Sequence, residues 1–411
     1  MKFALTQYLN PLNHKCVSDH VQKWGLDKYV KKFDTVCAAK LFIFAQVKQI
    51  QHYTDISQYL NDKKELQQTI GLASISTSQL SRKWRSLDSK FLARTFQHVV
   101  RQTIARLGHE KATNRLQKLT LIDSSTISLC LTRYRWAEMS KHKSGVKFHL
   151  RFIHTEAGAY PEHVTLTHAK VNDRTQMDEL VTDDPEVLHV FDRGYVNYKR
   201  FDQYCGASIR FVTRLLGNAD FDVVESREVA PGTSIVRDAI IFLGPRNTRY
   251  VMKHPVRLVE CLDKDGEPFM VCTNDLQLSA EEIAEVYRRR WQIELFFKWI
   301  KQHFHVKKCY GTSLNAVYNQ IYTALIAFCL TLLIQAEASH TGPLLRVMKV
   351  LRLHLYDPFA SFLQALFRKA SRPSKGRGKT WDAERIFKET LHQYEAGEAE
   401  HLDDLTYDPI H

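Results

Sequence analysis

One acidic residue, Glu294, stands among cations between Tyr287 and Lys308. This segment holds no other Asp or Glu, and its seven lysines and arginines are Arg288, Arg289, Arg290, Lys298, Lys301, Lys307 and Lys308. The carboxylate could form a helix-surface ion pair with Arg290 or Lys298, each four residues away. It could instead bind Mg²⁺, which prefers carboxylate oxygens, while the cations hold the phosphates of a nucleic acid. The residues around it must decide between the two.

The sequence around Glu294 predicts an amphipathic helix. Ser279 and Glu282 form a capping box, so the helix is expected to begin there. At about 100° per residue, four polar side chains then share an arc of roughly 60° beside the apolar face. They are Tyr287, Arg290, Glu294 and Lys301, with Trp291 and Lys298 at the borders of the arc. This stripe presents one carboxylate together with groups that can contact phosphate.

The elements before this helix change character along the chain. Up to about residue 115, apolar residues recur at three- and four-residue steps, which predicts an all-helical domain. β-branched runs then predict strands over 118–129, 145–154 and 162–171, an antiparallel meander. A short helix, a buried strand over 187–191, a helix ending at Gly206 and a strand over 208–215 follow. The fold class is therefore α/β.

The four polar residues of the stripe have the spacing of the Tyr-Arg-Glu-Lys signature, and this resembles a family of bacterial insertion-sequence transposases, the DDE transposases. Two further family features occur in order: Asp123 in LTLIDSSTISL and Asp192 in VFDRGY, each after a β-type apolar run. The resemblance covers roughly residues 115–335. It implies a ribonuclease-H-like mixed sheet with the first Asp on the first strand, the second after the fourth, and the Glu on a later helix.

The resemblance also implies the chemistry of the site. Asp123, Asp192 and Glu294 would be both the catalytic residues and the ligands of two Mg²⁺ ions, for which Mn²⁺ would substitute. Such ions activate the attacking water or 3′-hydroxyl and stabilise the leaving oxygen. The partner would be double-stranded DNA, both the transposon ends and the target.

DNA contacts are expected from the same stripe. By resemblance, Arg290 and Lys301 would contact phosphates near the cleaved end, and Tyr287 would contact the backbone beside a displaced base. Lys298 and Trp291 flank them. Some relatives stack that base on a Trp in a β-rich insertion, but residues 206–280 contain no Trp. Whether Trp291 or another aromatic (Phe242, Tyr250 or Phe269) takes this place is open, as is a hairpin intermediate.

Two weaker groups of cations lie elsewhere. Arg210 and Arg214 alternate on one face of SIRFVTRL, and could line the DNA path or belong to a solvated strand face. Arg82, Lys83 and Arg85 lie on a helix that follows a Ser/Thr-rich turn. That helix could enter a major groove, or its cations could form a solvated surface.

Charge and length suggest the domain plan. The 411 residues carry a net charge of +13, which favours a polyanionic partner. Residues 1–120 hold 20 Lys or Arg against 8 Asp or Glu, a balance of +12, and residues 380–411 hold 2 against 9, a balance of −7. We expect a helical DNA-binding domain (1–115), a catalytic domain (116–214 and 276–340), a β-rich insertion (215–275) and a helical C-terminal region (341–411) with a basic linker over 371–379.

Composition excludes some classes of protein. The eight cysteines are scattered without metal-like spacing, so neither structural zinc nor a disulfide framework is expected. The longest apolar run, Ile321 to Ile334, is shorter than the roughly 20 residues that span a bilayer. We therefore expect a buried helix there in a cytoplasmic protein, which the family resemblance implies to be bacterial and nucleoid-associated.

The leading hypothesis is a cut-and-paste transposase that binds terminal inverted repeats, cleaves the ends and joins the 3′-hydroxyls to target DNA as a homodimer. One alternative is a ribonuclease-H-like nuclease without strand transfer, against which the Tyr287 to Lys301 signature argues. Another is a domesticated sequence-specific DNA-binding protein, which an incomplete set of carboxylates would indicate. The region from Arg346 onward is a candidate for the dimer interface.

Overall fold

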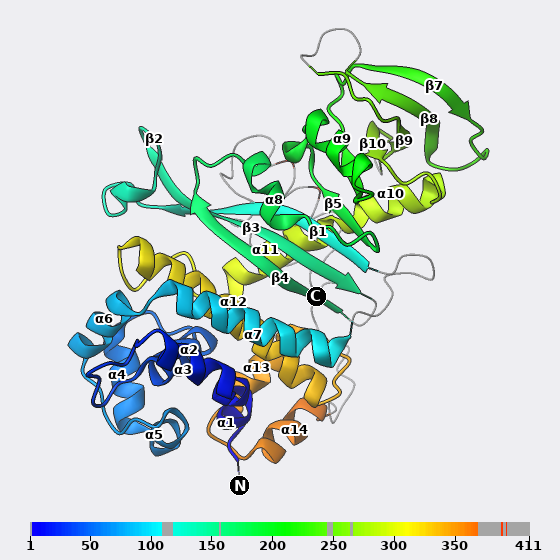
Figure 1. Ribbon diagram of the computed structural model, residues 1–411. Coiled ribbons are helices and arrows are strands. Elements are labelled where there is room, and N and C mark those ends of the chain that lie inside the picture. Colours follow the sequence, from blue (N-terminus) through cyan, green and yellow to red (C-terminus); the bar gives the residue numbers. More distant parts are fainter. Residues whose placement is uncertain are drawn as a thin grey trace. The chain divides into compact units, whose positions relative to one another are not determined.

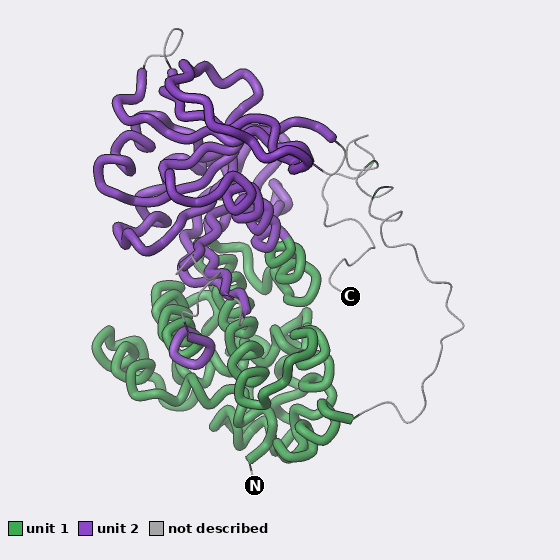
Figure 2. The backbone as a smooth tube through the Cα atoms, turned by 90° about the vertical axis from the view of Figure 1, so that its right-hand side faces the viewer, with its two compact units in different colours: residues 1–103, 295–411 green, residues 104–294 purple. Residues whose placement is uncertain are grey.

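The computed structural model describes residues 2–108, 118–155, 158–244, 250–263 and 266–368, together with Lys388 and His392. The predicted basic linker and most of the acidic tail lie outside these residues. The chain forms two compact units, one from residues 1–103 and 295–411, the other from residues 104–294 (Figure 2). Residues 295–340, which the sequence-based division assigns to the catalytic domain, belong to the same unit as the N-terminal helices.

The first unit is helical, as the apolar spacing predicts. Its helices are α1 (Ala4–Tyr8), α2 (Lys15–Lys23), α3 (Thr35–Lys48), α4 (Tyr53–Asp62), α5 (Lys64–Ile70), α6 (Thr77–Ser86), most of α7 (Ser89–Leu107) and of α11 (Trp291–His303), α12 (Leu314–Glu337), α13 (Leu344–His354) and α14 (Phe359–Phe367) (Figure 1). α3 packs against α12, and every residue of α3 from Leu41 to Val47 is buried. A helix that is apolar on all sides belongs in a core.

The apolar run in α12 is part of a 24-residue helix, longer than the run itself. Among the described residues, this is the one helix long and apolar enough to cross a membrane by length and composition, and 83% of its most apolar window is buried in the protein. Its amides have partners as well: the side-chain nitrogen of Asn319 donates to the carbonyl of Leu87 at 2.8 Å. These features are typical of a core helix.

The second unit is built on one ten-stranded sheet (Figure 1). Its strands are β1 (Lys118–Leu129), β2 (Glu138–Ser140), β3 (Lys143–Thr155), β4 (Gly158–His168), β5 (Val187–Phe191), β6 (Arg210–Arg214), β7 (Phe221–Arg227), β8 (Ile235–Leu243), β9 (Val256–Leu262) and β10 (Pro268–Thr273). β1, β3 and β4 form the predicted antiparallel meander, and β5 and β6 continue the sheet in parallel from β1. The order β4-β3-β1-β5-β6 is that of the expected ribonuclease-H-like core.

The β-rich insertion extends this same sheet. β10 pairs antiparallel with β6, and β9, β8 and β7 follow outward in that order. The helix α10 (Ala280–Arg289) packs against β6, β9 and β10. The insertion therefore provides part of the surface on which α10 lies.

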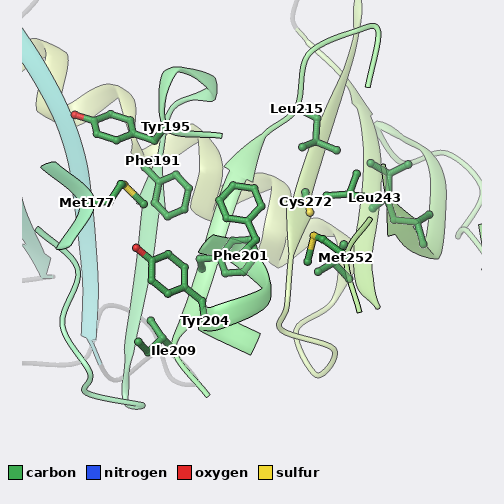
Figure 3. Packing of buried hydrophobic residues seen from close by; sticks show 14 of the residues in the cluster. Met177, Phe191, Tyr195, Phe201, Tyr204, Ile209, Leu215, Leu243, Met252 and Cys272 are labelled. Carbon is green, nitrogen blue, oxygen red and sulfur yellow. The ribbon is translucent and has the colours of Figure 1, made fainter. Parts of the chain in front are cut away.

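Aromatic packing holds the parallel strands together (Figure 3). The rings of Phe191 on β5 and Phe211 on β6 are stacked at 6.0 Å, and Phe201 on α9 (Tyr198–Gly206) lies 4.7 Å from Phe211. Ile122 on β1 belongs to the same buried cluster. Buried apolar residues thus directly precede both Asp123 and Asp192.

The start of α10 is fastened by a buried ion pair. Arg257 on β9 and Asp238 on β8 are 4% and 5% exposed, and Nη2 of the arginine lies 2.6 Å from Oδ2 of the aspartate. A second guanidinium nitrogen, Nη1, donates to the carbonyl of Leu278, which precedes the N-cap Ser279. The predicted capping box of Ser279 and Glu282 is confirmed.

A second buried acid, Asp202 on α9, binds the segment that precedes β9. Asp202 accepts hydrogen bonds from the Tyr250 hydroxyl at 2.8 Å, the His254 ring at 2.7 Å and the backbone N–H groups of Lys253 and His254. Burial favours its neutral form, but the hydrogen bonds from His254, the Lys253 N–H and Tyr250 outweigh this and hold the pKa of Asp202 at about 2.

We expect Asp202→Asn to destabilise the protein at neutral pH and to matter less in acid. Because the folded pKa lies below the unfolded value of about 3.9, the ionised acid contributes about 2 kcal/mol that is present above roughly pH 5 and is lost as the pH falls toward 2. Urea unfolding at pH 7 and pH 3 measures this, with the exposed Asp178→Asn as control. A difference between wild type and Asp202→Asn that stays constant with pH would contradict the assignment.

Candidate active site

Strand register brings Asp123 and Asp192 together. β1 and β5 run parallel with Ile122 opposite Phe191, and each aspartate is the residue that follows. Neighbouring strands lie about 4.8 Å apart, so the two aspartates lie side by side, Asp123 within β1 and Asp192 directly after β5. The apolar runs and the two Asp residues are predictable from the sequence, whereas this register is a property of the fold.

The helix that carries Glu294 is interrupted at Arg290. α10 ends at Arg289 and α11 begins at Trp291. At the junction, the N–H of Arg290 bonds to the carbonyl of Tyr287, and the N–H of Ile293 bonds to that of Arg290, both with the three-residue spacing of a 3₁₀ turn. The register arithmetic assumes one straight helix and misses this turn. Tyr287, Arg290 and Glu294 nevertheless face the two aspartates.

The Arg290 guanidinium joins two of the carboxylates. Its Nη1 lies 3.1 Å from Oδ2 of Asp123, and its Nη2 lies 2.6 Å from Oε1 of Glu294. The Tyr287 hydroxyl donates to Oδ1 of Asp192 at 3.4 Å. Glu294 therefore forms the expected ion pair with Arg290 and also lies at the candidate metal site, because the same guanidinium binds Asp123 on β1.

The buried carboxylates of the site favour the binding of further positive charge. Burial raises the pKa of Asp123 to about 7, with Arg290 opposing the shift and Glu294 and Asp192 adding to it. Burial also raises the pKa of Glu294. Burial disfavours the charged form of Arg290 too, but Asp123 and Glu294 reverse this, and its pKa is raised. One guanidinium does not fully compensate three carboxylates.

These carboxylates fit a divalent cation. Three carboxyl groups are the hard oxygen donors that Mg²⁺ and Mn²⁺ prefer. Within the described residues, no three His, Cys, Asp or Glu side chains are already gathered at metal-binding distance. At this site Asp123 and Glu294 are separated by the Arg290 guanidinium, which pairs with both and takes the place of a metal cation.

The other two arginines of the run have a different role. Arg288 lies 3.3 Å and Arg289 3.5 Å from the carboxylate of Glu285, which is exposed on the same helix. Of the three successive arginines, only Arg290 therefore contacts Asp123 and Glu294.

An aromatic and a cation extend the site along the sheet. The Phe269 ring on β10 lies 6.1 Å from the Tyr287 ring, and the Arg214 guanidinium lies 5.4 Å above Phe269. Arg210, at the other end of β6, instead pairs with the buried Asp275 at 2.5 Å. The structure thus separates the two arginines that alternate on this strand, and Arg214 is the one near Tyr287.

The remaining aromatic and basic candidates are distributed as follows. Trp291 is 40% exposed at the first turn of α11. Lys298 and Lys301 are half-buried further along α11, in the helical unit. Tyr250 is engaged with Asp202, and Phe242 lies on β8, half-buried.

In the helical unit, α6 begins with a capping box of Ser76 and Gln79. Arg82 and Arg85 are exposed, whereas Lys83 turns inward to Asp27 at 3.2 Å and is 12% exposed. Two of the three predicted DNA-contacting cations on α6 are therefore accessible.

Sequence reasoning missed Asp173, which lies beside β1 and accepts a hydrogen bond from Ser124 at 2.9 Å. Sequence patterns also indicate no role for the buried His149, whose Nδ1 lies 3.3 Å from Asp173. No local spacing connects these residues, because the β1–β3 register and the loop after β4 bring them together.

Comparison with known proteins gives a consistent result. The model of the family described as "Transposase DDE domain" matches residues 114–330. A probable transposase for insertion sequence element IS5377 of Geobacillus stearothermophilus is 31% identical over 266 residues, which are 63% of this chain and 67% of the relative. A putative transposase of Sinorhizobium fredii, y4zB, is 32% identical over 56% of this chain and 64% of its own length. The chain thus spans about two thirds of the length of these relatives.

Among solved structures, the piggyBac transposase in a synaptic complex with hairpin DNA resembles the chain with a TM-score of 0.45 and 10% identity. The likeness covers 93% of this chain and 88% of that one.

Proposed function

Because the chain belongs to the DDE transposases of bacterial insertion sequences, we propose that it binds the terminal inverted repeats of its element, cleaves the ends and joins the 3′-hydroxyls to target DNA. The observation that carries this proposal is the convergence of Asp123, Asp192 and Glu294 around Arg290. Cleavage and joining are both phosphoryl transfers, which require little from the protein beyond positioning and charge.

Divalent metal dependence follows from the family, and we propose two Mg²⁺ ions, replaceable by Mn²⁺, held by Asp123, Asp192 and Glu294. When bound, the ions supply an activated oxygen nucleophile and stabilise the leaving oxygen. The chain itself holds the carboxylates at adjoining positions through the β1–β5 pairing. Arg290 pairs with Asp123 and Glu294. Once a metal ion neutralises these acids, the guanidinium can bind a DNA phosphate instead.

We propose DNA contacts for polar and aromatic groups on the helices α10 and α11 and on the neighbouring strands β6 and β10. Arg290 and Lys301 contact phosphates near the cleaved end, and Tyr287 contacts the adjacent backbone. Lys298 and Arg214 add positive charge. Trp291, at 40% exposure, can stack on a base, and so can Phe269, which already lies beside Tyr287 and Arg214.

Recognition of the end is proposed for the helical unit. The exposed Arg82 and Arg85 on α6 can enter a major groove, while Lys83 stabilises the helix through Asp27. Because two ends must be cut and joined, we propose a homodimer in the DNA complex.

The function is tested with a labelled DNA end incubated with the full chain in Mg²⁺, Mn²⁺ or EDTA. We expect metal-dependent nicking by wild type, a loss of at least about 1,000-fold in Glu294→Gln, and retained end binding in that variant. Glu285→Gln, an exposed acid on α10, is the matched control. Unchanged cleavage by Glu294→Gln would refute the catalytic assignment.

A second readout separates the alternatives. Joined products with a supercoiled target plasmid indicate a transposase, whereas nicking without joining indicates a nuclease that lacks strand transfer. Sequence-specific binding without metal-dependent nicking would support a domesticated DNA-binding protein.

A further inference from the structure

An acid that the site described above does not use lies next to the strand of Asp123. Asp173 begins the short 3₁₀ helix η3 (Asp173–Gln176). Its Oδ1 accepts a hydrogen bond from the Ser124 hydroxyl at 2.9 Å, and the same oxygen lies 3.1 Å from Lys147 Nζ and 3.3 Å from His149 Nδ1. Two hydrogen-bond donors and one imidazole ring, from two strands, thus surround one carboxylate oxygen.

The β1–β3 pairing explains why these donors share one place. Ser124 lies opposite His149, and Thr126 lies opposite Lys147, so the side chains of Ser124, Lys147 and His149 project from one face of the sheet. Lys147 also donates to the carbonyl of Val171 at 3.2 Å, which ties down the chain just before Asp173. The carboxylate is therefore held from both sides.

This carboxylate is ionised. Burial favours its neutral form, but the donors His149, Lys147 and Ser124 outweigh burial and hold the pKa of Asp173 at about 2. Its side chain is 25% exposed, and that of His149 is fully buried.

Ser124 connects Asp173 to the catalytic acid. The backbone N–H of Ser124 donates to Oδ1 of Asp123 at 2.7 Å. The pairing of β1 with β5 ends at Ile122 and Phe191, directly before Asp123. Ser124 therefore lies beyond the part of β1 that is hydrogen-bonded to β5. The hydrogen bond from the Ser124 hydroxyl to Asp173 supplies a restraint at this point.

A buried hydroxyl points to the same cluster. Tyr195 is 1% exposed, and its hydroxyl has no hydrogen-bond partner among the described residues. Burial raises its pKa, the nearby charges of Asp123, Asp173 and Asp192 add to the shift, and the neighbouring Ser124 hydroxyl opposes it. In Figure 3 the hydroxyl points away from the ring of Phe191. A buried hydroxyl without a partner is unfavourable, so this group has a hydrogen bond to gain when the acids take up a ligand.

We propose that Asp173 is a positioning residue for the catalytic metal site: it immobilises Ser124, whose N–H orients the Asp123 carboxylate, and the Tyr195 hydroxyl donates to the carboxylates once they hold a cation. Lys147 and His149 keep Asp173 in place. This inference rests on the proposed function, because it takes Asp123 as a metal ligand. Groups that orient metal ligands commonly contribute 10- to 100-fold to affinity, which sets the expected scale at roughly that range.

The test measures Mn²⁺ binding to the full chain without DNA, by calorimetry or by the loss of the free-ion electron paramagnetic resonance signal. We expect Asp173→Ala to weaken binding by about 10-fold or more. Asp173→Asn, which keeps an oxygen acceptor for Ser124, is expected to lie closer to wild type. Ser124→Ala keeps the backbone N–H and should show a smaller loss. The control is Asp178→Ala, an acid with 75% side-chain exposure that pairs with Arg200.

Thermal unfolding of each variant in EDTA separates positioning from a purely structural role. A structural role alone lowers the unfolding midpoint and leaves the Mn²⁺ affinity of the folded protein unchanged, which would overturn the inference. If Asp173→Ala does not fold, Ser124→Ala decides, and wild-type affinity in that variant would overturn the inference. Absence of Mn²⁺ binding to wild type would instead refute the proposed function. Loss of Mn²⁺ affinity in Glu294→Gln but not in Asp173→Ala would refute only the role of Asp173.

Discussion

Arg290→Ala is expected to lower the stability of the metal-free protein by about 3 kcal/mol, because it leaves Asp123 and Glu294 without their shared cation. The three side chains are 13%, 17% and 27% exposed, so solvent screens them only partly. Adding Mg²⁺ or Mn²⁺ should raise the unfolding midpoint of Arg290→Ala more than that of wild type, since the metal replaces the missing charge. Thermal unfolding with EDTA and with metal measures both effects.

The loss in Arg290→Ala should also depend on pH. Asp123, with its pKa near 7, needs the guanidinium only when it is ionised. A folded pKa above the unfolded value means that ionisation works against folding, so removing the cation costs more as the pH rises through 7. Arg289→Ala, whose partner Glu285 has 53% side-chain exposure, is the control and should change little. Equal midpoints of Arg290→Ala and wild type in EDTA at pH 8 would contradict this account.

Arg257→Ala is expected to destabilise the protein by roughly 3–5 kcal/mol, because it leaves Asp238 charged and buried without a partner. It also removes the bond to the Leu278 carbonyl that fixes the start of α10. We therefore expect cleavage to fall even at temperatures where the variant remains folded. Urea unfolding and the nicking assay measure the two effects separately.

Replacing both members of the pair tests the cause of that loss. Arg257→Met combined with Asp238→Leu should recover most of the stability, since it removes the uncompensated charge, but not the contact with Leu278. Arg237→Ala is the control, because Arg237 lies 3.8 Å from Glu260 on the same two strands and has 50% side-chain exposure. A double variant as unstable as Arg257→Ala would show that charge burial is not the reason.

The three candidate carboxylates, Asp123, Asp192 and Glu294, are recognisable in the sequence. Asp123 and Asp192 each follow a buried apolar run of the predicted α/β unit, but the parallel register that places them side by side is a property of the fold. The capping box at Ser279 fixes where the Glu-bearing helix begins, and helical periodicity assigns Glu294 to the side of Tyr287 and Arg290. These features depend on local hydrogen bonds and on side-chain alternation, both of which can be read from short segments.

Long-range contacts determined the rest. The interruption of the helix at Arg290 and the ion pair of its guanidinium with Asp123 are not predictable from the helix alone, because Asp123 lies on a distant strand. Likewise, Arg210 and Arg214 look equivalent on one strand face, yet Asp275 neutralises the first while the second lies over Phe269. Which cations remain available for DNA is thus decided by acids distant in the sequence.

Glu294 shows most clearly which properties follow from the sequence and which from the tertiary structure. Its residue type, its helix and its spacing from Arg290 are properties of the sequence alone, and they allowed both an ion pair and a metal ligand. Only the tertiary structure places Asp123 3.1 Å from the same arginine and Asp173 behind the strand of Asp123. The physical reason is that a carboxylate binds metal through its neighbours in space, and strand register and loop closure, not local periodicity, select those neighbours.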